Sequence, residues 1–116
     1  MTKRLFSKEA KAKREKDGSL PALIRALMAD YERRKVCIME KSTSRRVRME
    51  YEYINSRIFE GAGEIVGGAI AEKFIKEIGM GIGYAHSDIG CYSESAYKRN
   101  KAEIIVSVAR KLHLSD

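Results

Sequence analysis

The stretch RRVRMEYEYINSRIFEGAGEIV, residues 45–66, spaces its apolar side chains as an α-helix does. The spacing runs four, three, four, four and three through Val47, Tyr51, Ile54, Ile58, Ala62 and Ile65. Because an α-helix has about 3.6 residues per turn, these side chains share one face. The preceding Lys-Ser-Thr-Ser break, residues 41–44, offers capping hydroxyls. We therefore predict a helix over 45–66 with one buried face.

The segment upstream repeats this helical pattern. Ser19 is a suitable N-cap, and Pro21 lies in the first turn, where its missing amide proton costs little. The pattern blurs at residues 33–35 and resumes at Ile38 and Met39. These features predict one helix over about 20–41. Its expected buried stripe consists of Leu20, Leu23, Ile24, Leu27, Met28 and Tyr31.

Glycines divide the segment downstream of residue 66. The pair Gly67-Gly68 predicts a helix end, and the apolar residues that follow predict a third helix over about 69–78. The sequence GMGIG, residues 79–83, does not follow a strand and has no adjacent Gly-Lys-Ser/Thr. We interpret it as a helix C-cap and connector rather than a phosphate-binding loop.

The last segment has the pattern of a helix-turn-helix. We predict a short helix over 84–89, a glycine turn at 90–92, and a long helix that Ser93 caps and that reaches about residue 113. Its expected core side consists of Tyr97, Ile104, Ile105, Val108 and Leu112. The predicted fold is all-α, a small helical bundle with a C-terminal helix-turn-helix at about 84–113. Residues 1–18 would form a basic N-terminal arm and residues 19–116 a single helical domain.

The opposite side of the last helix carries the candidate DNA-binding residues. At 100° per residue, Arg99 lies opposite the apolar stripe, with Ser95 and Ala102 beside it and Lys98 on the flank. Short side chains permit close approach to a groove, arginine can bind guanine O6 and N7 together, and lysine can contact phosphate. Lys101 falls near the apolar seam and would have to extend toward solvent or lie where the helix overhangs the core. The predicted DNA-binding residues are Ser93, Ser95, Lys98, Arg99 and Lys101.

The charge distribution favours a polyanionic partner. The net charge of the 116 residues is +7, and cations that neutralise phosphates release condensed counterions. The basic excess is N-terminal: residues 1–18 hold seven Lys/Arg and three acids, whereas residues 50–83 hold three and six. The arm is expected to be a solvated tail or to lie along a phosphate backbone. Predicted backbone contacts are Lys3, Arg4, Arg45, Arg46 and Arg48.

The C-terminal run SESAYKRNKAEIIVSVARKLHL, residues 93–114, resembles the end of phage late-gene transcriptional regulators of the ArpU and RinA type. Their C-terminal part is similar to the DNA-binding region 4 of sigma factors. Upstream, YEYINSRIFEGAGEI resembles the helix that precedes the motif, and the resemblance covers about residues 50–114. It implies a DNA-binding regulator encoded by a phage or prophage. The matching residues are Tyr53, Ile54, Asn55, Ile58, Ser93, Tyr97, Lys98, Arg99, Lys101, Ala102, Ala109, Leu112 and Leu114.

The turn departs from the usual helix-turn-helix. That motif has a small residue in its first helix and a glycine four positions later, whereas Ala85 and Gly90 are five positions apart. The turn is therefore one residue longer, or the first helix is shifted. The alternative interpretation of the segment is an ordinary helical hairpin whose exposed face is basic.

Other chemistry is not indicated by the sequence. His86, Asp88 and Cys91 are close together, but a zinc site needs three or four ligands in a set, and His113 is near the far end of the last helix. No catalytic arrangement is apparent, so we predict a protein that is not an enzyme and has no metal or cofactor. The separated cysteines, the lack of an export signal and the short apolar stretch at 65–71 predict a cytoplasmic protein without membrane spans.

Two classes of function follow from these features. The first is a DNA-binding transcription regulator that reads duplex DNA with its last helix, with a homodimer and contact with RNA polymerase as further expectations. The second is a non-enzymatic interaction protein, such as a small terminase-like packaging subunit or an adaptor that binds RNA polymerase or another protein. In the second class, the basic ends and the acidic centre of the chain make protein contacts.

Overall fold

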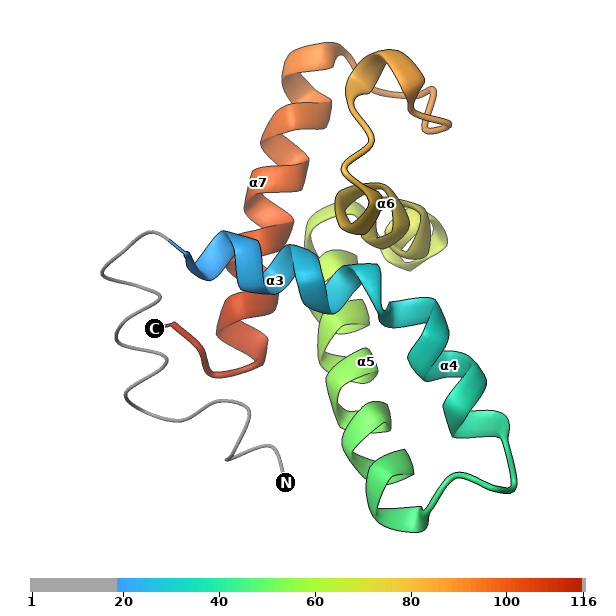
Figure 1. Cartoon of the computed structure of the whole chain (residues 1–116). Coiled ribbons are helices and arrows are strands. Elements are labelled where there is room, and N and C mark those ends of the chain that lie inside the picture. Colours follow the sequence, from blue (N-terminus) through green and yellow to red (C-terminus); the bar gives the residue numbers. More distant parts are fainter. Residues whose placement is uncertain (1–18, 116) are drawn as a thin grey trace.

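The computed structural model describes residues 19–115, and these form an all-α fold (Figure 1). No β-strand occurs among them, which confirms the predicted fold class. The predicted arm, with Lys3 and Arg4, lies outside the described residues. The elements are α3 (Leu20–Ala29), α4 (Tyr31–Met39), α5 (Arg45–Val66), α6 (Gly68–Met80), the 3-10 helix η1 (Tyr84–His86) and α7 (Glu94–Lys111).

Helix α5 is the central element, and its predicted bounds of 45–66 are confirmed. It begins where the Ser44 hydroxyl accepts a hydrogen bond from the Val47 amide at 3.3 Å. It ends at Gly67, whose φ of 85° is readily adopted only by glycine. Figure 1 shows α4 beside the first half of α5, while α3 crosses in front of α7 and α5. Helices α4, α6 and α7 all pack on α5.

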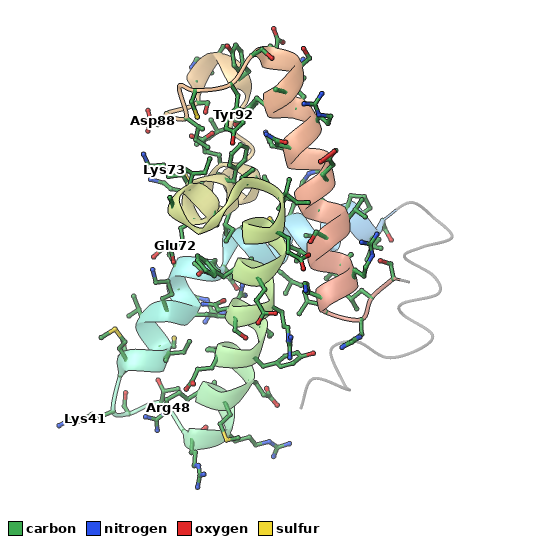
Figure 2. All side chains as sticks on the ribbon, turned by 180° about the vertical axis from the view of Figure 1, so that it is seen from behind. Lys41, Arg48, Glu72, Lys73, Asp88 and Tyr92 are labelled. Atoms are coloured by element: carbon green, nitrogen blue, oxygen red, sulfur yellow. The ribbon has the colours of Figure 1, made fainter. Side chains whose placement is uncertain are left out.

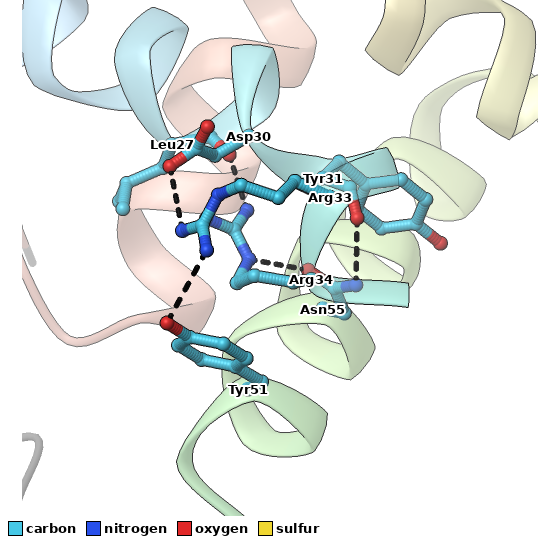
Figure 3. Close-up of polar contacts among 7 residues, drawn as sticks. All are labelled: Leu27, Asp30, Tyr31, Arg33, Arg34, Tyr51 and Asn55. Atoms are coloured by element: carbon cyan, nitrogen blue, oxygen red, sulfur yellow. Dashed lines mark hydrogen bonds and ion pairs between the residues drawn. The ribbon is translucent and has the colours of Figure 1, made fainter. Parts of the chain in front are cut away.

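The helix predicted over 20–41 is two helices, so that prediction was wrong. Helix α3 ends at Asp30, and α4 then turns away along α5 (Figure 1). The buried side chain of Arg34 spans the break: it donates to the Leu27 carbonyl and, at 2.7 Å, to the Asn55 amide oxygen (Figure 3). The Asn55 amide nitrogen in turn donates to the Tyr31 carbonyl at 3.1 Å. Met39, where the apolar pattern was expected to resume, is 86% exposed.

Close backbone contacts at two glycines hold the helices together. A Cβ on Gly61 of α5 would lie 2.7 to 2.9 Å from atoms of Val108 in α7. A Cβ on Gly79 of α6 would lie 2.6 Å from the Ala29 amide nitrogen in α3. Both distances are too short for a side chain, so glycine permits these crossings. The fully buried side chains around them include Ile24, Met28, Ile58, Phe74, Ile75, Ile78, Tyr97, Ile104, Val108 and Leu114.

The connection from α6 to α7 contains less helix than the sequence indicated. Gly81 ends α6 in the left-handed conformation, with φ of 70°. Instead of the predicted helix over 84–89, the chain forms only the three-residue helix η1, so this prediction was wrong. The reason is the buried carboxylate of Glu77, which accepts hydrogen bonds from the Ser87 hydroxyl at 2.6 Å and the Asp88 amide at 2.8 Å. These bonds hold the backbone in an extended path after η1.

The Glu77 carboxylate also joins this connection to α7. It accepts a third hydrogen bond, at 2.6 Å, from the buried Tyr97 hydroxyl. Burial raises the pKa of Glu77, but the hydrogen bonds from Ser87, Tyr97 and Asp88 outweigh burial, so the pKa lies below its ordinary value. Burial and the neighbouring carboxylate raise the pKa of Tyr97 to about 12. The start of α7 is therefore fixed from inside the core.

Candidate nucleic-acid interface

Helix α7 has one anchored side and one open side. Its predicted core residues are all buried, and the Ser93 hydroxyl caps the helix by accepting from the Ala96 amide at 3.2 Å. Near its C-terminal end, Glu64 of α5 pairs with Lys111 at 2.7 Å and accepts from the Ser107 hydroxyl at 3.2 Å. The opposite side, which we call the outward face of α7, is exposed and consists of Ser95, Lys98, Arg99 and Ala102. The helical-wheel placement of these four residues is confirmed.

The charges on this face differ in their availability. Arg99 makes no ion pair or hydrogen bond with another described residue, so its guanidinium is available to a partner. Lys98 pairs with Glu94 one turn earlier, at 2.9 Å, and both side chains are largely exposed. Such exposed pairs contribute little and separate at low cost. Glu103, also exposed, lies one turn beyond Arg99 and would repel phosphate, which confines an anionic partner to the first turns of α7.

Lys101 is not on the outward face. Its ammonium group lies 4.9 Å from the centre of the Tyr97 ring and donates to the Ile82 carbonyl at 2.7 Å. The pKa of Lys101 lies below its ordinary value, mainly because burial disfavours the charged ammonium. The negative charge of Glu77 opposes this effect, and the positive charge of Arg25 adds to it. The sequence placed Lys101 near the apolar seam, and its half-buried position confirms that placement, but its ammonium group is held against Tyr97 and Ile82 instead of extending toward solvent. It therefore lies at the edge of α7 beside the glycine loop.

Arg45, Arg46 and Arg48 gather elsewhere, at the tip between α4 and α5. Arg45 and Arg46 are exposed and Arg48 is half-buried. In Figure 2, Lys41 and Arg48 lie at one end of the molecule, and Asp88 and Tyr92, which precede α7, lie at the other. The structure therefore does not bring these arginines together with the outward face of α7. We call this second region, residues 39–49, the α4–α5 tip.

The α4–α5 tip and its approach also expose large apolar side chains. Val36 is 57% exposed, Met39 86% and Met49 58%. Exposed apolar groups next to cations are typical of a surface that contacts another macromolecule.

The basic side chains of residues 33–35 all have partners within the fold. Arg34 is 3% exposed and bonded to Leu27 and Asn55, as described above. Arg33 pairs with Asp30 at 2.9 Å, and Lys35 pairs with Glu72 of α6 at 3.1 Å. Arg34 therefore has a structural role and is out of reach of a phosphate.

Arg25 is the residue that sequence reasoning missed. It is an exposed position of α3, and the fold brings it beside Lys98 and Lys101 in one pocket. No local signal separates it from other polar positions of an amphipathic helix. Only the crossing of α3 over α7 gives it a place near the candidate interface.

Metal and membrane chemistry receive no support from the described part of the chain. Within residues 19–115, no three His, Cys, Asp or Glu side chains gather as metal ligands. Cys37 and Cys91 are free thiols. None of the helices in this range is both long and apolar enough to span a bilayer.

Comparison with known proteins finds no match: no family model, no curated protein and no solved structure is similar to this chain. The candidate interface therefore has to be judged on its own geometry and charge.

Proposed function

We propose that this protein is a transcription regulator that binds double-stranded DNA and inserts the outward face of α7 into the major groove. The observation that carries the proposal is the position of Arg99, which has no side-chain partner within residues 19–115, on the exposed side of a helix whose other side is anchored in the core. A rigid helix can present a guanidinium to guanine O6 and N7 in a fixed register. Ser95 and Ala102 are short enough to let the helix axis approach the base edges.

The first turns of α7 suit this docking better than its later turns. Ser93 and Ser95 have hydroxyls, and Lys98 can leave its exposed ion pair with Glu94 at low cost. This end of the helix can therefore contact both phosphates and bases. Glu103 and the neutral Val106 follow on the exposed side. Helix-turn-helix proteins likewise insert the recognition helix N-terminal end first.

We infer a helix-turn-helix arrangement in which α6 and α7 are the two helices. Phe74 of α6 and Tyr97 of α7 lie with ring centres 5.6 Å apart, and Glu77 joins the same two helices. The connection between them, residues 81–93, is longer than the three or four residues usual for this motif. The proposed protein is thus a long-turn variant within the class that the phage regulator resemblance indicates.

The α4–α5 tip supports a second candidate function, a protein-interaction module. Its exposed Met39 and Met49, together with Val36 just before the tip, are suited to a protein contact, whereas duplex DNA offers little apolar surface to them. In a regulator the same tip would serve to form a homodimer or to contact RNA polymerase. In an adaptor or packaging subunit it would be the main site, and Arg99 would be dispensable.

Selection of bound duplexes from a random pool, at two salt concentrations, tests the proposal. A regulator should enrich a defined sequence. The protein should bind that sequence more tightly than random DNA at both salt concentrations, because base contacts do not depend on counterion release. Enrichment of no sequence, with binding that disappears at the higher salt, would refute sequence-specific reading and favour the interaction module.

A further inference from the structure

A pocket of about 370 Å³ lies where α3, the end of α6 and the start of α7 meet. Three cationic side chains line it: Arg25, Lys98 and Lys101. Ile78, Ile82 and Ile105 provide an apolar lining. Its volume falls within the range of about 300–1,000 Å³ that small-molecule sites occupy.

The cations of this pocket lack a full set of counter-charges. No carboxylate lines the pocket, and Arg25 makes no ion pair with any described residue. Lys101 uses one N–H on the Ile82 carbonyl and keeps two donors. Lys98 has its partner, Glu94, outside the pocket lining.

The fold holds these like charges close together. Lys101 is partly removed from water, the carboxylate of Glu77 offsets part of that cost from outside the pocket lining, and the like charge of Arg25 adds to it. Lys101 is also held over the Tyr97 ring at 4.9 Å, so it cannot move away freely. Like charges in a partly desolvated pocket repel one another, and an anion between them removes that cost. Gly81 and Gly83 line the pocket, and the space beside each is open, because a Cβ on either would meet nothing within 4 Å.

We propose that this pocket binds a phosphate group, with Arg25, Lys98 and Lys101 as its ligands. A phosphate has enough oxygens to accept from all three side chains at once. It comes either from the backbone of bound DNA or from a free phosphorylated compound whose apolar part lies on the isoleucines. Only the first source rests on the function proposed above.

Titration with inorganic phosphate and with phenyl phosphate, followed through the backbone amide resonances of residues 81–83, tests the proposal. The wild-type protein should show saturable shifts at these residues, with phenyl phosphate binding more tightly than inorganic phosphate. Arg25→Ala should weaken binding about tenfold, the usual consequence of losing one charged hydrogen bond. Lys101→Met, which keeps the aliphatic stem over Tyr97, should have a similar effect.

Lys73→Ala is the matched control, because Lys73 is an exposed lysine of α6 outside the pocket (Figure 2). It should bind both probes as the wild type does. Circular dichroism and amide dispersion confirm that each variant is folded. Shifts absent from residues 81–83, or equal weakening by all three variants, would overturn the proposal.

Binding of duplex DNA separates the two sources. If the phosphate is that of DNA, duplex should displace phenyl phosphate, and Arg25→Ala should weaken selected and random duplexes alike and reduce the salt slope by about one. If the ligand is free, phenyl phosphate should bind without competition from DNA. Phosphate binding without any DNA binding would refute the proposed regulator function and support the phosphate-binding pocket. DNA binding without phosphate binding would refute the pocket and leave the regulator function supported.

Discussion

Two basic stretches, residues 33–35 and 98–101, look alike in the sequence but differ in whether the fold provides partners for all of their cations. In the first, every cation has a partner, and the buried Arg34 donates to the Leu27 carbonyl and to the Asn55 amide oxygen. In the second, Arg99 points outward without a described partner. A run of basic residues thus predicts net charge, but only the packing of neighbouring helices decides which cations stabilise the fold and which remain available.

The largest expected effect is that of Arg34→Met, which removes the hydrogen bonds from Arg34 to Leu27 and Asn55. Methionine fills part of the volume but leaves the Leu27 carbonyl and the Asn55 amide oxygen buried without donors. We expect a loss of about 3 kcal/mol in the free energy of unfolding, measured by urea denaturation.

Arg33→Ala is the control from the same stretch. Arg33 and Asp30 are both about half exposed, so their ion pair contributes little. The expected loss is below about 1 kcal/mol. A loss for Arg33→Ala as large as that for Arg34→Met would contradict the division between the two arginines.

The helix that carries the second stretch packs closely on α5 at Gly61, which lies against Val108. Gly61→Ala forces a Cβ against Val108 and should cost about 2 kcal/mol by overpacking. Gly63→Ala, in the same helix, meets nothing within 4 Å and should instead gain up to about 1 kcal/mol through helix propensity. Urea denaturation of both variants gives the sign of each effect, and destabilisation by Gly63→Ala would contradict this account.

A smaller effect is expected for Glu77→Gln, which tests how the start of α7 is fixed. Glutamine cannot accept from Ser87, Asp88 and Tyr97 as the carboxylate does, so we expect a loss of about 1.5 kcal/mol at neutral pH. Folding lowers the pKa of Glu77, so its contribution is complete above the unfolded value near 4.5 and is lost as the pH falls through the folded pKa.

The difference in unfolding free energy between the wild type and Glu77→Gln should therefore shrink in acid. Urea denaturation at neutral pH and below pH 4.5 measures it. A difference that stays constant across this range would show that the Glu77 charge does not contribute.

The sequence predicted those elements whose signals are local. Helix 45–66 has an apolar stripe, a serine cap and a terminal glycine, and all three are where the sequence indicated. The Ser93 cap and the core side of α7 were likewise predictable. The break at Asp30 was not, because it depends on a hydrogen bond from Arg34 to Asn55, twenty-one residues away. The same is true of the segment 84–89, whose path is set by Glu77 in another helix.

The candidate site divides in the same way. A helical wheel was sufficient to place Ser95, Lys98, Arg99 and Ala102 outward. The pocket with Arg25 requires α3 to cross α7, which no periodicity within either helix specifies. The separation of the arginines of the α4–α5 tip from α7 is also a property of the assembled fold.

The central claim is that Arg99 contacts the bases of DNA, whereas the arginines of the α4–α5 tip contact only its phosphate backbone. Its most direct test measures the affinities of Arg99→Ala and Arg46→Ala for a selected duplex and for random DNA. The account predicts that Arg99→Ala loses about 1–3 kcal/mol on the selected duplex and much less on random DNA, whereas Arg46→Ala weakens both alike. Equal losses on the two duplexes for both variants would contradict it.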